Sequence, residues 1–154
     1  MEMKRFIGRV AVITGAARGI GKACALRFAE EGASVACLDM AVERNELTAA
    51  ECRAQGVEAF ALTCNVTDPD SVKAAVATTL DAWSRIDVLV ASAGIYSGSP
   101  LVEVPLKQWQ RLIDINLTGV FLINQAVAPV LMQQRSGSII NISSSGSLVP
   151  LPHV

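Results

Sequence analysis

Five short apolar runs recur along the 154-residue chain, and most of their positions are apolar on both faces of an extended segment. This pattern is typical of parallel strands that helices cover on both sides. Strands that face water on one side instead alternate between polar and apolar positions. We therefore predict strands over residues 10–13, 34–38, 59–62, 88–90 and 138–142.

Segments with helical character fill the spaces between these runs. Gly32 and Gly56 close the first two segments and Asp68-Pro69 opens the third, as is expected at helix ends. The alternation of strands and helices predicts an α/β fold with a doubly wound parallel sheet, in a single domain over residues 1–154. The predicted helices are residues 19–31, 41–55 and 69–84, with two more after Pro105 that meet near residues 116–119.

Composition narrows the range of partners. The chain is 51% hydrophobic and carries a formal charge of −1 without a basic run, so nucleic acid is not expected as a partner. The N-terminus lacks the apolar core of a signal peptide, and Asn124, Gln125 and Pro129 interrupt the most apolar later stretch. We therefore expect a soluble cytoplasmic protein that does not enter a membrane. The four cysteines form no C-x-x-C pair and His153 is the only histidine, so no metal site is expected.

The first predicted strand leads directly into the glycine-rich turn TGAARGIG, residues 14–21. Such a turn between a strand and a helix lets backbone N–H groups approach a pyrophosphate at the positive end of the helix. Asp39 follows the second strand, 18 residues beyond Gly21, where a carboxylate can accept hydrogen bonds from both hydroxyls of a ribose. The order of strand, glycine turn, helix, strand and acid predicts a dinucleotide site.

The spacing T-G-x-x-x-G-x-G resembles that of the short-chain dehydrogenase/reductase family, whose fold is Rossmann-like. Four residues match it: Thr14, Gly15, Gly19 and Gly21. Further segments resemble family motifs in the same order along the chain. They are Asn65-Val66-Thr67-Asp68, Ala93-Gly94, Asn116 and Asn141-Ile142-Ser143-Ser144.

The resemblance implies an NAD-dependent oxidoreductase that transfers hydride between nicotinamide and a secondary alcohol or ketone. It implies that Ser144 orients the substrate oxygen and that Asn116 holds a water molecule in a proton relay. It also implies a homodimer or homotetramer that associates through long helices. The cofactor-binding residues that it implies are Thr14, Gly15, Ala17, Arg18, Gly19, Ile20, Gly21, Asp39, Asn65, Val66, Ala93 and Gly94.

Two local departures from the family pattern concern the cofactor site. Where the family commonly has Asn-Asn-Ala-Gly, this chain reads Ala91-Ser92-Ala93-Gly94, so the amide side chains that brace the sheet are missing. Where the family often has Asp, this chain has Asn65, whose amide oxygen can still accept a hydrogen bond from the adenine amino group.

A larger departure concerns the proton donor. The resemblance implies a catalytic Tyr about thirteen residues after Ser144, which falls three residues beyond Val154, and a Lys one helical turn further on. The only tyrosine is Tyr96, and Pro100 stands where its Lys would be. We therefore expect part of a longer polypeptide, with the sheet truncated after its fifth strand, that lacks the Tyr-Lys pair and the substrate loop and is inactive alone.

Several alternatives stay open at this stage. The chain can be an inactive nucleotide-binding fragment or pseudoenzyme, or another Rossmann-like user of adenosine such as a methyltransferase. Asp39 favours NAD over NADP because it repels a 2′-phosphate, whereas Arg18 in the glycine turn favours NADP. Tyr96 and Trp109 either line the mouth of the pocket or serve only in packing. The remaining expectations are turn-forming roles for Ser143 and Ser145 and an apolar pocket wall from Ile95, Tyr96, Val149 and Leu151.

Overall fold

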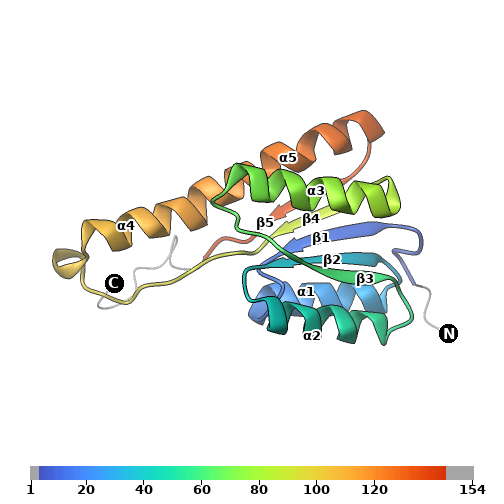
Figure 1. Cartoon of the computed structure of the whole chain (residues 1–154), viewed down its shortest axis with the longest axis horizontal. Helices are drawn as coiled ribbons and strands as arrows, with labels where there is room; N and C mark the ends of the chain where they lie inside the picture. Colours follow the sequence, from blue (N-terminus) through green and yellow to red (C-terminus); the bar gives the residue numbers. More distant parts are fainter. Residues whose placement is uncertain (1–3, 145–154) are drawn as a thin grey trace.

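The computed structural model describes residues 4–144, and within them a single sheet of five parallel strands has the order β3-β2-β1-β4-β5 (Figure 1). Each strand agrees with its predicted range to within one residue at either end. The central strands β1 and β4 are buried along their whole length, so their apolar runs mark them directly, whereas the edge strand β5 is exposed. The strands are β1 Val10–Thr14, β2 Ser34–Asp39, β3 Ala59–Thr63, β4 Val88–Ala91 and β5 Ser138–Asn141.

Helices cover both faces of the sheet, which confirms the doubly wound α/β fold. Figure 1 shows α1 and α2 on one face and α3 and α5 on the other, while α4 extends past the carboxyl ends of the strands. A short 3₁₀ turn over Leu101–Glu103, which the sequence did not predict, precedes α4. The helices are α1 Gly19–Glu30, α2 Val42–Arg53, α3 Pro69–Trp83, α4 Leu106–Ile113 and α5 Gly119–Gln134.

The two faces of the sheet have different cores. Along β1, Ala11 and Ile13 point toward α1 and α2, and Val12 points toward α3 and α5. The α1 side is filled by small side chains such as Ala25 and Ala29, so that helix lies close to the sheet. The other side is filled by larger ones. Its members include Val72, Leu89, Ile123 and Val127, each at most 1% exposed.

Helix ends follow the capping rules that the sequence predicted. Gly32 and Gly56 have φ of +92° and +83°, left-handed conformations that glycine adopts without strain after a helix. At the start of α3, the Asp68 carboxylate accepts a hydrogen bond from the Asp70 amide at 3.0 Å, with Pro69 in the first helical position.

The helical region after Pro105 differs from the prediction of two helices that meet near residues 116–119. A π turn over Asp114–Thr118 joins α4 to α5, so the helix runs on without a break (Figure 1). At its end Gly119 lies against Val66, whose Cγ2 would be 2.7 Å from a Cβ at that position. A π turn accommodates one extra residue without ending the helix, and such turns often mark functional sites.

This continuous stretch, Leu106–Gln134, has the length and composition of a membrane span, with 29 residues. In this fold Ile123 and Val127 are fully buried among residues of the sheet and α3, while 22% of the most apolar part of the stretch is buried.

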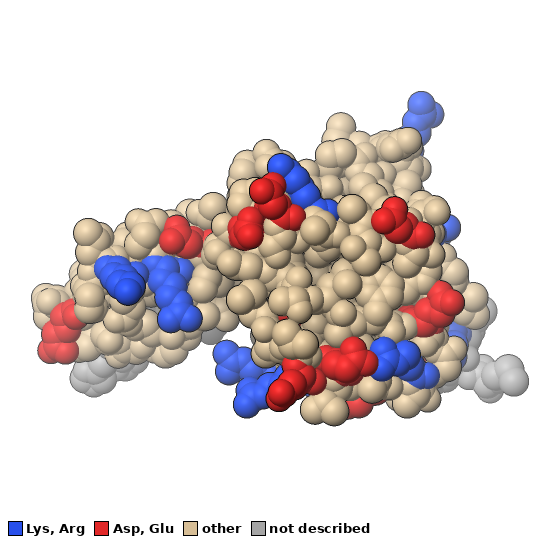
Figure 2. All heavy atoms as spheres, in the orientation of Figure 1, with Lys and Arg blue, Asp and Glu red and all other residues tan. Residues whose placement is uncertain are grey.

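Charged side chains on the surface are mixed in sign. Figure 2 shows acidic and basic groups interspersed over the visible face, without a large patch of either sign. Lys22 on α1 pairs with Glu51 on α2 at 2.7 Å, and Arg53 pairs with Glu46 at 2.5 Å. Such exposed pairs contribute at most about 1 kcal/mol each to stability.

A buried carboxylate ties the first and fourth strands together at the end of the sheet opposite α4. Asp87, whose side chain is 6% exposed, accepts hydrogen bonds from the Val10 amide at 2.9 Å and Arg9 at 2.7 Å. Arg85 donates two more, at 2.8 and 2.7 Å. Burial alone would raise the pKa of Asp87, but the hydrogen bonds from Arg85, Val10 and Arg9 outweigh it and hold the pKa below its usual range.

We expect Asp87→Asn to lower the free energy of unfolding at pH 7 by about 2–3 kcal/mol, because it removes the charge that two guanidinium groups face. Since the folded-state pKa is lowered, this stabilisation is complete above the unfolded pKa and disappears as the pH falls through the folded pKa. Urea unfolding at pH 7 and below pH 4 measures both effects. Asp81→Asn, at an exposed carboxylate of α3, is the control, and a difference that stays constant with pH would contradict the argument.

Candidate active site

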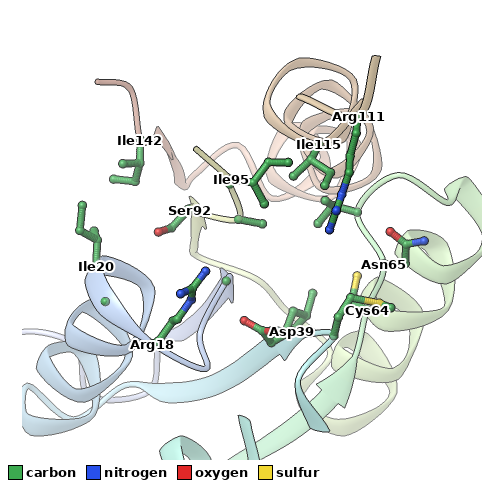
Figure 3. Close-up of a pocket in the computed structure, with 17 residues that line it drawn as sticks. Arg18, Ile20, Asp39, Cys64, Asn65, Ser92, Ile95, Arg111, Ile115 and Ile142 are labelled. Carbon is green, nitrogen blue, oxygen red and sulfur yellow. The ribbon is translucent and has the colours of Figure 1, made fainter. Parts of the chain in front are cut away.

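A pocket of about 490 Å³ lies at the carboxyl ends of β1, β2, β3 and β4 (Figure 3). The chain places β2 and β3 on one side of β1 and β4 and β5 on the other, so this is the point where the strand order reverses. Ligands of open α/β sheets bind at such points. Nine of the twelve predicted cofactor-binding residues line this pocket: Gly15, Arg18, Gly19, Ile20, Asp39, Asn65, Val66, Ala93 and Gly94.

The three glycines of the turn are required for different structural reasons. A Cβ at Gly15 would lie 2.9 Å from the backbone of Ala93, and one at Gly21 would lie 2.2 Å from the carbonyl oxygen of Gly15. Both positions therefore exclude any side chain. Gly19 has φ of +57° and nothing within 4 Å of a Cβ, so its backbone borders open space in the pocket.

The N-terminus of α1 meets the pocket at this turn. The N-cap residue Arg18 makes no side-chain capping bond, and Gly19 and Ile20 in the first helical turn line the pocket. The N–H groups at a helix N-terminus carry a partial positive charge that favours an anion. This end of the pocket therefore fits a phosphate group.

Asp39 lies at the end of β2 and lines the pocket beside this turn. One carboxylate oxygen accepts a hydrogen bond from the Ala17 amide at 3.1 Å, and the other accepts one from the Ala41 amide at 2.9 Å. The side chain therefore fixes the glycine turn to the end of β2. Each oxygen keeps one further acceptor position, which is the capacity that a pair of ribose hydroxyls requires. Arg18 extends into the same pocket (Figure 3).

Thr14, Ala17 and Gly21, which were predicted to bind the cofactor, do not line the pocket, and their part in cofactor binding stays a prediction. The Thr14 side chain is buried, and its hydroxyl accepts hydrogen bonds from the amides of Ser92 and Ala93, both at 3.1 Å. Ala17 gives its N–H to Asp39, and Gly21 packs under Gly15. These residues shape the turn, and the Thr14 hydroxyl braces the two strand ends where the family's amide side chains are missing.

Asn65 lines the pocket, and its contact with adenine stays a prediction. Its amide oxygen accepts hydrogen bonds from the Thr67 amide at 3.1 Å and from the Thr67 hydroxyl at 2.9 Å. Both lone pairs of that oxygen are therefore engaged within the turn. Asn65 thereby stabilises the turn after β3. Asn side chains commonly do so by accepting a hydrogen bond from the backbone amide two residues further along the chain.

Asn116 lies in the π turn and holds the loop after β4. Its amide oxygen accepts a hydrogen bond from the Ile95 amide at 2.9 Å, and its amide nitrogen donates one to the Ile95 carbonyl at 2.8 Å. Ile95 itself lines the pocket, so Asn116 positions part of the pocket wall. Its role in binding a relay water stays a prediction.

Ser144 is exposed and follows β5, two residues after Ile142, which lines the pocket. Ser144 does not belong to the pocket lining, so its catalytic role also stays a prediction. Tyr96 and Trp109 are 72% and 51% exposed and line no part of the pocket. Ser145, Val149 and Leu151 lie outside the described residues.

Several residues of the pocket wall were not predicted from the sequence. Arg111 and Ile115 approach from the helical region above the pocket, and Cys64 approaches from the end of β3 (Figure 3). Cys64 is 3% exposed and burial raises its pKa to about 11, so the thiol stays protonated at neutral pH. The i, i+4 spacing of Arg111 and Ile115, directly before Asn116, was the available indication. Within residues 4–144 no group of three or more His, Cys, Asp or Glu is arranged to hold a metal ion.

A family model described as short chain dehydrogenase matches residues 9–154. The chain belongs to the short-chain dehydrogenase family. A 3-oxoacyl-(acyl-carrier-protein) reductase of Synechocystis sp. is 44% identical over 151 residues, which are 97% of this chain and 61% of the relative. The corresponding reductase of Thermotoga maritima is 42% identical over 140 residues, which are 91% of this chain and 57% of the relative.

Solved structures of short-chain dehydrogenases agree with this placement. The crystal structure of an NAD⁺-bound xylitol dehydrogenase superposes with a TM-score of 0.92 at 38% identity, over 97% of this chain and 58% of that one. A short-chain type dehydrogenase/reductase from Mycobacterium marinum gives the same TM-score at 36% identity, over 96% of this chain and 60% of that one. The chain thus spans about three fifths of the length of these relatives.

We expect Thr14→Val to lower the free energy of unfolding by about 2–4 kcal/mol, because two backbone N–H groups lose their only side-chain acceptor at nearly constant volume. Thr14→Ser keeps the hydroxyl and should lower the free energy of unfolding clearly less than Thr14→Val does. Urea unfolding of the two variants measures the difference, and equal losses would show that the hydroxyl does not brace the strand ends.

Proposed function

We propose that this chain forms the cofactor-binding part of an oxidoreductase that transfers hydride between NAD and a secondary alcohol or ketone. One observation carries the proposal: the glycine turn, the Asp39 carboxylate and the Ala93-Gly94 backbone all border one pocket at the switch point of the sheet. An NAD⁺-bound structure among the similar proteins supports the choice of cofactor.

The residues present fit the parts of a dinucleotide in order. The uncapped N-terminus of α1, beside the open space at Gly19, binds the pyrophosphate. The Asp39 carboxylate accepts hydrogen bonds from the ribose hydroxyls. Bound NAD supplies the nicotinamide carbon that accepts or releases hydride. Ile95 and Ile142 give the pocket apolar walls on the β4 and β5 side, which exclude water from the reacting groups.

In this proposal Ser144 holds and polarises the substrate oxygen, because it follows the strand that ends beside Ile142. Asn116 holds a relay water next to Ile95. The reaction also moves a proton to or from the substrate oxygen, and neither a Ser hydroxyl nor an Asn amide supplies it at neutral pH. Tyr96 does not fill that role, since it is exposed and does not line the pocket.

The class of substrate is proposed only at the level of a small-molecule ketone or secondary alcohol. The relatives include both 3-oxoacyl-(acyl-carrier-protein) reductases and a xylitol dehydrogenase, whose names indicate different substrates.

We also propose a cytoplasmic homodimer or homotetramer. Its interface would cover exposed apolar side chains of the long helix such as Leu117 and Phe121, which are 63% and 58% exposed.

We expect Gly19→Val to abolish NAD binding, because the added side chain would fill the space where the pyrophosphate approaches the backbone. Gly56→Val is a matched control, since Gly56 also has positive φ and an open Cβ position but does not line the pocket. Calorimetric titration with NAD should show binding by the control and none by Gly19→Val. Undiminished affinity in the Gly19 variant would remove the phosphate assignment.

We expect the unmutated protein to bind NAD at least about tenfold more tightly than NADP. A carboxylate about 4 Å from a phosphate repels each of its charges by roughly 1 kcal/mol in water and roughly 4 at an effective dielectric near 20. Asp39→Asn should narrow this preference, and Glu43→Gln, at an exposed acid of α2, should leave it unchanged. Titration of both cofactors at equal ionic strength decides the question. Tighter NADP binding by the unmutated protein would show that Arg18 outweighs Asp39.

A further inference from the structure

Arg111 enters the pocket from α4 and has no partner there. Figure 3 shows its side chain extending from the helix toward the end of β3, between Ile115 and the Cys64–Asn65 segment. Within residues 4–144 the guanidinium forms neither a hydrogen bond nor an ion pair with another side chain, although Asp39 borders the same pocket. A guanidinium in this position is available to a ligand.

The backbone that carries Arg111 is fixed relative to the pocket. Ile115 lies one turn further along the same helical face and also lines the pocket. The next residue, Asn116, forms two hydrogen bonds with the Ile95 backbone, at 2.9 and 2.8 Å. The helix therefore cannot swing away from the loop after β4 without losing both bonds, and Arg111 is held above the pocket.

The occupant of this end of the pocket follows from the proposed function, on which this inference rests. In a dinucleotide the adenine lies beyond the ribose, on the side away from the pyrophosphate. With the pyrophosphate at Gly19 and the ribose at Asp39, the adenine extends toward the end of β3. The wall there consists of Leu38, Cys64 and Val66, whose side chains are at most 8% exposed and offer a flat base an apolar surface.

We propose that the Arg111 guanidinium stacks on the adenine ring and closes this end of the pocket. A guanidinium is planar and weakly hydrated. It therefore loses less hydration free energy than an ammonium does when it stacks against an aromatic ring. Stacking on the face of the adenine ring is independent of hydrogen bonds in the plane of the ring. The Asn65 amide oxygen, in the turn after β3, already accepts two hydrogen bonds from Thr67.

The test compares ligands with and without adenine. In the full-length protein, Arg111→Met should weaken binding of NAD and of ADP-ribose by about 3- to 20-fold, the usual range for a cation on an aromatic ring. Nicotinamide mononucleotide carries a phosphate but no adenine, so its affinity should change less than about twofold. Lys107→Met is the matched control, because it removes an exposed charge one turn away on the same helix, and it should change neither affinity.

Arg111→Lys separates stacking from charge. It keeps the positive charge but removes the planar guanidinium, so NAD binding should stay at least about threefold weaker than in the unmutated protein. Full recovery in Arg111→Lys, an equal loss for nicotinamide mononucleotide in Arg111→Met, or unchanged NAD affinity in Arg111→Met would each overturn the stacking role. Failure of the unmutated protein to bind either NAD or ADP-ribose would instead overturn the proposed function itself, and this inference with it.

Discussion

The close approach of the glycine turn to the end of β4 determines the geometry of the whole site. A Cβ at Gly15 would meet the Ala93 backbone at 2.9 Å, and the neighbouring Thr14 hydroxyl accepts the amides of Ser92 and Ala93. These contacts bring the two halves of the sheet together where the strand order reverses. The Asp39 carboxylate then holds the turn from the other side through the Ala17 amide. The pocket has its shape because one short turn is fixed to two strands at once.

Much of the fold could be read from the sequence because local chemistry determines it. Strands buried on both faces appear as continuous apolar runs, and helix ends at Gly32, Gly56 and Asp68 carry the residues that their backbone conformation requires. The π turn over Asp114–Thr118 could not be predicted in the same way, since a single π turn adds only one residue within a helix and has no residue signature of its own. Its position depends on the contacts of Asn116 and Gly119 with distant segments.

The site shows the same division between local and distant contacts. Gly19 and Asp39 were predicted to face the ligand and do line the pocket, because the turn itself places them there. Thr14 was assigned to the ligand but bonds to amides 78 and 79 residues away, a partnership that a motif does not reveal. Asn65 was assigned to adenine and lines the pocket, and its amide oxygen also accepts hydrogen bonds within its own turn. An exposed helical arginine such as Arg111 looks like any solvated charge until the topology brings its helix over the pocket.

The strand order has a consequence for the time course of folding. β1 lies at the centre of the sheet, yet β2 is its only neighbour until the chain reaches β4, with Ala11 paired to Val88 and Thr14 to Ala91. Such long-range parallel pairing is slow, because the entropy cost of closing a large loop comes before any stabilising contact between the strands has formed. As the chain emerges from the ribosome, one side of β1 stays open while the segments from α1 to α3 are made. During that interval this central, fully buried strand depends on rapid cover by its own helices, or on chaperones, to avoid pairing with another chain.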